Sequence, residues 1–255
     1  MTMSDQSHFW SRAAASYEQE FIDPYLPDVR NPVCAAVAEL ADPRRGVVAD
    51  LGCGIGPLLP FLAKHFRRVI AVDFAEGMLA RAREACAGLK NVEFQQRGLT
   101  ELSDLKGELD VAVAVNSLVM PDLGDLEAAL ESVRAALRPG GGFLGIVPAM
   151  DAVHYFTMLL LDRARAQGLP PEKARQNAAH HAEHDYYDFA FGEFRYQGLE
   201  QHFWQPFEVR YRLKRAGFRR VRMTKVLLSW SQFGPTAPGL KDQPPPWDWF
   251  FAALT

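Results

Sequence analysis

Short apolar runs alternate along the chain with segments whose apolar residues recur every three or four positions. Five of the runs are predicted to be buried strands, at residues 47–49, 69–72, 92–94, 111–115 and 143–147. Helical periodicity is found between them, at residues 58–66, 77–88 and 126–137. Strands that alternate with helices in this way predict a parallel sheet with helices on both faces.

The segments outside this pattern have a different character. Residues 1–40 carry apolar positions at helical spacing, interrupted by prolines, and are predicted to form two N-terminal helices. Residues 150–204 show no strand alternation and are predicted to form an inserted helical lid. After a helix at 206–216, residues 221–225 and 226–230 are predicted to be two adjacent strands that close the sheet as a C-terminal antiparallel pair.

The remaining residues, 235–255, form a tail rich in proline and aromatic side chains. We predict that it is a rigid strap that packs on the core or on a second subunit. The whole pattern indicates an α/β fold, with a doubly wound, seven-stranded and mostly parallel sheet. Residues 1–255 are predicted to be one domain, in which residues 41–149 and 205–234 form the core.

Glycines at alternate positions follow the first predicted strand. Gly52, Gly54 and Gly56 allow backbone N–H groups and a helix N-terminus to approach a ligand closely. Dinucleotide-binding proteins have a similar turn, but their G-x-G-x-x-G spacing places the third glycine one residue later. Asp73, at the end of the second strand, suits the ribose hydroxyls of a nucleotide cofactor, whether or not that cofactor is a dinucleotide. Asp50 suits the ammonium of an amino-acid moiety, whereas a pyrophosphate gains nothing from this charge.

Three segments in this order resemble motifs of the class I methyltransferase family. They are D-x-G-x-G-x-G at residues 50–56, the second motif at 69–79, and the turn Leu-Arg-Pro-Gly-Gly-Gly at 137–142. The resemblance covers about residues 8–148 and 205–230, and it implies a methyltransferase with S-adenosylmethionine as its cofactor. The cofactor-binding residues that it implies are Tyr17, Asp50, Gly52, Cys53, Gly54, Gly56, Asp73, Phe74, Met78, Leu99, Asn116 and Ser117.

The resemblance also implies how the adenosine part is bound. Asp73 is expected to bind the ribose, while Phe74 and Met78 flank the adenine. Members of the family often have an acid after the third strand that holds the adenine amine. This chain has Gly98 at that position, so backbone atoms near Leu99, or the side chain of Gln96, are expected to take over that contact.

The transfer site is expected beyond the fourth strand. Segment 109–121 resembles the part of the family that ends beside the reactive methyl group, which places Asn116 and Ser117 near it. Tyr17 resembles an N-terminal aromatic residue that closes over the cofactor, although a packing role stays open. Transfer from a sulfonium depends mainly on positioning, and a base is needed only if the acceptor arrives protonated. His154 is the residue that we predict for this role, with a surface position as the alternative.

The acceptor is predicted to be a small molecule, apolar or aromatic, because residues 150–204 are rich in aromatic side chains. Two alternatives stay open at this point. The first is a nicotinamide-dependent oxidoreductase, which calls for the longer glycine spacing and a parallel sixth strand. The second is a protein that binds S-adenosylmethionine without catalysis, and whose lid leaves no cavity beside the methyl group.

Composition narrows the partners further. The net charge of −3 shows no basic excess, so neither nucleic acid nor a membrane is an expected partner. The three cysteines have no C-x-x-C spacing and the histidines at 180–184 have no recognisable ligand frame, so no disulfide or metal site is predicted. We expect a cytoplasmic protein that is a monomer or a homodimer.

Overall fold

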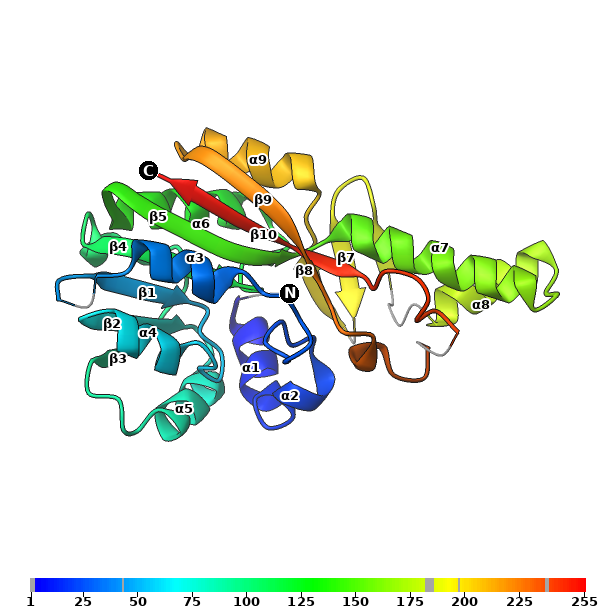
Figure 1. Cartoon of the computed structure of the whole chain (residues 1–255), viewed down its shortest axis with the longest axis horizontal. Helices are drawn as coiled ribbons and strands as arrows, with labels where there is room; N and C mark the ends of the chain where they lie inside the picture. The colour runs from blue at the N-terminus through cyan, green and yellow to red at the C-terminus, as the bar shows by residue number, and fades with distance from the viewer. Residues whose placement is uncertain (1–2, 43, 182–185, 197, 237–238) are drawn as a thin grey trace.

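A seven-stranded sheet forms the centre of the computed structural model, which describes residues 3–42, 44–181, 186–196, 198–236 and 239–255. Its strands lie in the order β3–β2–β1–β4–β5–β10–β9 (Figure 1). Their bounds are β1 Val47–Leu51, β2 Arg68–Asp73, β3 Val92–Gln96, β4 Leu109–Val115, β5 Leu137–Pro148, β9 Arg219–Leu227 and β10 Trp247–Leu254. Strands β1 to β5 pair in parallel, whereas β10 is antiparallel to both of its neighbours. The predicted fold class is confirmed.

Helices cover both faces of the sheet because its strands are apolar on both sides. All five residues of β1 are buried: Val48 packs with the helices on one face, and Val47, Ala49 and Leu51 pack with those on the other. The first face is covered by α3 Val33–Leu40, α4 Leu59–His65 and α5 Glu76–Ala85. The second is covered by α6 Leu123–Ala136 and α9 Pro206–Arg215. The carboxyl ends of β1, β2 and β4 therefore meet at one edge of the sheet.

The last strand corrects the prediction for the C-terminal region. Residues 221–225 and 226–230 do not pair with each other, because β9 runs through the boundary between them as a single strand. Its antiparallel partner is β10, which comes from the predicted strap and lies between β5 and β9. A segment rich in proline and glycine, residues 235–246, separates the two strands, while residues 247–254 have the aromatic character that suits a strand. The tail thus completes the core sheet.

The predicted helical lid is only partly helical. It begins with α7 Met150–Ala166 and α8 Pro171–His181, which pack against each other beyond one end of the main sheet (Figure 1). A small antiparallel sheet follows, made of β6 Tyr186–Asp188, β7 Glu193–Tyr196 and β8 Leu199–His202. Trp204 fixes the end of this sheet to the core: its backbone N–H donates to Pro148 O at 2.8 Å and its Nε1 to Leu118 O at 2.7 Å.

The N-terminal segment is attached to α5, and it forms α1 Met3–Ala13 and α2 Tyr17–Glu20 before α3. Gly77 lets α1 approach, since a Cβ there would lie 2.4 Å from Ser11 O. The Arg81 guanidinium donates to Ala14 O and forms a 3.0 Å ion pair with Glu18. These contacts hold α2 over the carboxyl edge of the sheet. Among the described residues, no helix has the length and apolar composition that crossing a membrane requires.

Candidate functional site

The glycine loop after β1 has a conformation that its sequence requires. Gly52, Gly54 and Gly56 all have positive φ, at 74°, 54° and 85°. A Cβ on Gly52 would lie 2.2 Å from Ser117 Cβ, and one on Gly56 would lie 3.2 Å from Ala82 Cβ in α5. The loop is therefore packed closely against the end of β4 on one side and a helix on the other. Gly54, by contrast, faces open space, because nothing is within 4 Å of an added Cβ there.

Asp73 connects this loop to the second strand. Its carboxylate accepts hydrogen bonds from the backbone N–H groups of Gly54 and Ala75, both at 2.9 Å. Burial raises the pKa of Asp73, and these backbone hydrogen bonds oppose the shift because they favour the ionised form. The side chain is thus fixed at the carboxyl end of β2, where it lines a cavity together with Phe74 and Met78.

Asp50 lies deeper, at 3% exposure, near the end of β1. Burial, with a smaller contribution from the negative charge of Asp73, raises the pKa of Asp50 to about 7. Burial raises the pKa of the Tyr25 phenol well above 10, and the negative charge of the nearby Asp50 carboxylate raises it further. An ammonium at this position would stabilise ionised Asp50, which otherwise has only negative neighbours among the groups that shift its pKa.

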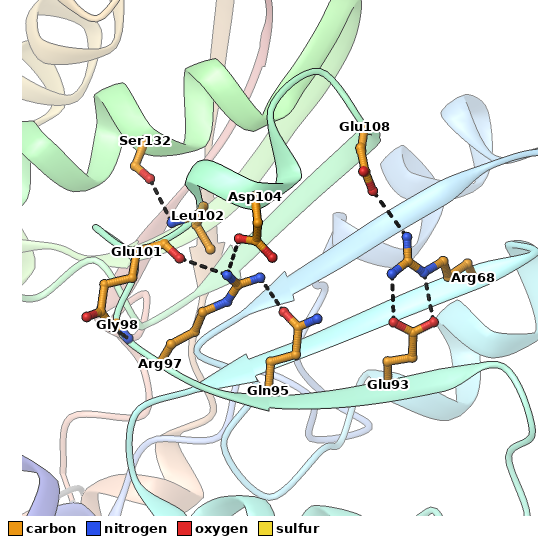
Figure 2. Close-up of polar contacts among 10 residues, drawn as sticks. All are labelled: Arg68, Glu93, Gln95, Arg97, Gly98, Glu101, Leu102, Asp104, Glu108 and Ser132. Carbon is orange, nitrogen blue, oxygen red and sulfur yellow. Dashed lines mark hydrogen bonds and ion pairs between the residues drawn. The ribbon is translucent and has the colours of Figure 1, made fainter.

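The loop after β3 is held by one arginine, as Figure 2 shows. The Arg97 guanidinium donates to the carbonyl of Glu101 at 2.8 Å and also binds the side chains of Asp104 and Gln95. Glu101 in turn accepts from the Gly98 N–H at 2.9 Å. Gly98 and the buried Leu99 line the same cavity as Asp73, so the predicted adenine contact has a fixed backbone to depend on.

Asn116 and Ser117 follow β4 and differ in what they can offer a ligand. Ser117 Oγ donates to Leu51 O at 2.6 Å, so its hydroxyl hydrogen is already used in fixing the glycine loop. Asn116 has a left-handed backbone, with φ 50°, which this residue type tolerates better than most. Its Nδ2 donates to Asp248 Oδ2 at 3.3 Å, whereas its buried Oδ1 has no hydrogen-bond partner among the described residues.

Three adjoining cavities lie at this edge of the sheet. Two of them, of about 180 and 50 Å³, contact the glycine loop, and we call them the loop cavities. The larger holds Asp73, and the smaller holds Asp50 and Cys53. The third, of about 280 Å³, is called the aromatic cavity after its lining. Tyr17 and Asn116 line all three, and the three cavities therefore meet at these two side chains.

Aromatic rings from four parts of the chain line the aromatic cavity. They are Trp10, Tyr17 and Phe21 from the N-terminal segment, Phe156 from α7, Phe194, Tyr196 and Phe203 from the small sheet and its end, and Phe233 and Trp247 from the C-terminal region. Burial and nearby acids raise the pKa of Tyr17 to about 12, and its phenol stays protonated at neutral pH. The cavity is thus apolar apart from a few polar side chains, which include Asn116, Gln232 and Asp248.

The predicted base, His154, is not part of this arrangement. It lies exposed on α7, with its ring packed edge-on against Phe189 at 5.0 Å, and it is absent from the described lining of all three cavities. Its position favours the surface alternative. Residues 182–185 of the histidine segment lie outside the described residues. No group of three ligating side chains occurs in the rest, and the absence of a metal stays a prediction.

Sequence reasoning missed the polar residues that the C-terminal strand brings to the aromatic cavity. Trp247 and Asp248 begin β10, and Asp248 is 5% exposed. The available signal was a single acid at the start of an otherwise apolar and aromatic run, residues 247–254, which has the composition of a buried strand.

Comparisons with known proteins agree with this geometry. Residues 48–141 match the family model described as a methyltransferase domain. The chain is 33% identical to a demethylmenaquinone methyltransferase of Clavibacter sepedonicus over 109 residues, which are 42% of this chain and 41% of the relative. A methyltransferase of Aspergillus fumigatus, tpcM, is 34% identical over 39% of this chain and 30% of the relative. This chain spans less than half the length of the curated relatives that it matches.

Solved structures match over far more of the chain. The 1,6-didemethyltoxoflavin N1-methyltransferase of Burkholderia thailandensis, with bound 1,6-didemethyltoxoflavin and S-adenosylhomocysteine, has a TM-score of 0.61 and 18% identity, with 99% of this chain and 86% of that chain covered. These findings confirm the class I methyltransferase resemblance in the core domain and the fold. The Burkholderia thailandensis enzyme was solved with S-adenosylhomocysteine, the demethylated form of the cofactor predicted for this chain.

Proposed function

We propose that this chain, whose residues 48–141 match a methyltransferase domain, transfers a methyl group from S-adenosylmethionine to a small apolar or aromatic acceptor. One observation carries the acceptor side of the proposal. A cavity of about 280 Å³ lined by aromatic rings adjoins the loop cavities, and Tyr17 and Asn116 line both. Pockets for small molecules are typically apolar, with a few polar groups that orient the ligand.

On the cofactor side, each acid has a distinct role. Asp73 accepts hydrogen bonds from the ribose hydroxyls, and the N–H groups of Gly54 and Ala75 fix its position. Asp50 binds the ammonium of the methionine moiety, either directly or through water. Phe74 and Met78 flank the adenine, and the backbone at Leu99 faces its edge in place of an acid. These assignments are supported by the cavity that Asp73, Phe74, Met78 and Leu99 share.

The chemistry needs little beyond this arrangement. The sulfonium is already an activated leaving group, so alignment of the acceptor with the methyl carbon provides much of the rate. Bound S-adenosylmethionine would supply an activated methyl group: the acceptor's lone pair would form the new bond to the methyl carbon, and the electrons of the broken C–S bond would remain on sulfur. Tyr17 and Asn116, at the boundary between the cavities, are suited to hold the two reactants in line.

The two alternatives are less well supported. A nicotinamide-dependent oxidoreductase calls for a parallel sixth strand, whereas β10 is antiparallel to β5 and β9. A non-catalytic binding protein calls for a lid that leaves no space beside the methyl group, whereas the aromatic cavity adjoins the loop cavities at Tyr17 and Asn116. The fold is also shared with an enzyme of Burkholderia thailandensis that binds a small heterocyclic molecule.

Calorimetric titration tests the cofactor, with S-adenosylmethionine, S-adenosylhomocysteine, NAD and NADP as ligands. We expect S-adenosylmethionine and S-adenosylhomocysteine to bind, and Asp73→Ala to lower the affinity for both. We expect neither NAD nor NADP to bind. A mass-spectrometric screen of small aromatic compounds with S-adenosylmethionine then tests the acceptor, through a gain of one methylene mass. Binding of a nicotinamide, or of neither sulfur nucleoside, would contradict the proposed cofactor site.

A further inference from the structure

A buried carboxyl group lies in the wall of the aromatic cavity. Asp248 is the second residue of β10, and in the sheet it is paired with Pro148 of β5 and Val226 of β9. It is 5% exposed and lines the cavity together with Trp247. The residue thus lies where the carboxyl ends of the parallel strands meet the space assigned to the acceptor.

The contacts of Asp248 connect it to the boundary with the cofactor. Its Oδ2 accepts from Asn116 Nδ2 at 3.3 Å, and Asn116 lines the loop cavities as well as the aromatic one. The backbone N–H of Ala149 also donates to this carboxyl. Burial raises the pKa of Asp248 to about 7, although both hydrogen bonds lower it. The group can therefore both accept and release a proton near neutral pH.

Unsatisfied polar atoms gather around the same cavity. Asn116 Oδ1, Gln232 Nε2 and Trp247 Nε1 are buried and have no hydrogen-bond partner among the described residues. All three residues line the aromatic cavity. A buried polar atom without a partner costs about 1–3 kcal/mol, so a ligand that carries both donors and acceptors and reached these atoms would recover part of that cost.

Building on the proposed function, we infer that Asp248 binds the reacting O–H or N–H of the acceptor and receives its proton during methyl transfer. The acceptor class is then an aromatic compound with an ionisable hydroxyl or ring N–H, such as a phenol or a heterocycle. The oxygen or nitrogen lone pair forms the bond to the methyl carbon, and the C–S electrons go to sulfur. The acceptor's proton passes to the Asp248 carboxylate and leaves to water after the product departs.

Other charged groups near the cavity are less suited to this role. Glu20 lines the cavity but is exposed to water. Asp151, on α7, already accepts from Trp249 Nε1 at 2.8 Å. Lys225, on β9, is exposed and has its Nζ 3.2 Å from the ring centroid of Trp247. Asp248 alone among these combines burial with a position on the cavity wall.

A pair of probes that differ in a single O–H tests this inference: 2-naphthol and its ether, 2-methoxynaphthalene. Their dissociation constants are measured at pH 8 in the presence of saturating S-adenosylhomocysteine. We expect the wild type to bind the naphthol at least about tenfold more tightly than the ether, because a hydrogen bond to a charged group favours it. Asp248→Asn should reduce this preference to within about threefold. The matched control, Asp151→Asn, changes a nearby carboxyl group outside the cavity lining, and this variant should keep the wild-type preference for 2-naphthol.

Equal binding of the two probes by the wild type, or binding of neither, would overturn the inference without any variant. An unchanged preference in Asp248→Asn that still binds S-adenosylhomocysteine would overturn it as well. Failure of the wild type to bind S-adenosylhomocysteine would instead reject the proposed function. With an acceptor found in the screen, kcat of Asp248→Asn should fall by about 100-fold or more, and its kcat/KM should lose the rise through pH 7.

Discussion

The affinity for S-adenosylmethionine should depend on pH through Asp50. In the proposed site this carboxylate binds the ammonium of the methionine moiety, so only its ionised form contributes. Burial places its pKa at about 7, well above its ordinary value of 3.8. As the pH falls through 7, the cofactor must bind a protein in which Asp50 is mostly protonated. Affinity should therefore weaken on the acid side and level off above pH 7.

The expected size of the effect follows from the ionised fraction. For a pKa of about 7, this fraction is about 3% at pH 5.5 and about 76% at pH 7.5. The dissociation constant should therefore change by up to about 25-fold across this interval, which is about 1.9 kcal/mol. The interval ends below pH 8 because an α-amino group loses its own proton near that value.

Isothermal titration with S-adenosylhomocysteine measures this change directly, and 5′-methylthioadenosine is the matched ligand control. The control ligand keeps the ribose, and with it the contact to Asp73, but it has no ammonium. Its affinity should vary much less with pH. Asp50→Asn should weaken the binding of S-adenosylhomocysteine by roughly 10- to 150-fold at pH 7.5, and the affinity of this variant should no longer fall at acid pH. The same slope for both ligands, or an unchanged slope in Asp50→Asn, would refute the role of Asp50.

Three further predictions concern the loop, the acceptor carboxyl and the N-terminal segment. Gly52→Ala should abolish binding of S-adenosylhomocysteine, because its Cβ would meet Ser117 at 2.2 Å; Gly107→Ala has a similar φ, +70°, but open space, and should only lower the unfolding free energy by about 1–2 kcal/mol in denaturant titration. Asp248→Asn should raise the thermal midpoint at pH 8 but not at pH 4: a folded pKa of about 7, against 3.8, means that ionising this carboxyl costs up to about 4 kcal/mol of stability as the pH rises, and an equal shift at both pH values would contradict the assignment. Tyr17→Ala should weaken both S-adenosylhomocysteine and 2-naphthol, while Tyr17→Phe keeps most of both affinities, since the ring lines all three cavities; loss of only one affinity in Tyr17→Ala would argue against a shared boundary.

The part of the site that could be predicted from sequence is local along the chain. The glycine loop, Asp50 and Asp73 belong to two neighbouring strand–loop–helix units, so their positions follow from the order of the elements. The positive φ of Gly52, Gly54 and Gly56 also follows from residue type. Here the spacing of a few residues determines the geometry.

The part that could not be predicted depends on pairing between distant segments. Nothing near Trp247 in the sequence indicates that β10 enters the sheet between β5 and β9, and the prolines before it suggested a strap instead. The exposed position of His154 depends on which face of α7 packs on the core, and only the tertiary structure fixes this. In the lid, β6 and β7 carry aromatic residues that also suited a helix core. Short strands of this kind have too little periodicity to be told from loops or helices.

The position of β10 also affects the order in which the two halves of the site can form during folding. The loop cavities are lined by residues between positions 6 and 125, mainly from the N-terminal segment and the loops that follow β1, β2, β3 and β4, whereas the aromatic cavity needs the pairing of Pro148 with Asp248. Long-range pairings close late because they carry the larger loop-closure entropy. A chain in which β10 has not yet entered the sheet would hold a nearly complete nucleoside site beside an unformed acceptor site. Cofactor present during refolding would then stabilise the loop cavities before the aromatic cavity has formed.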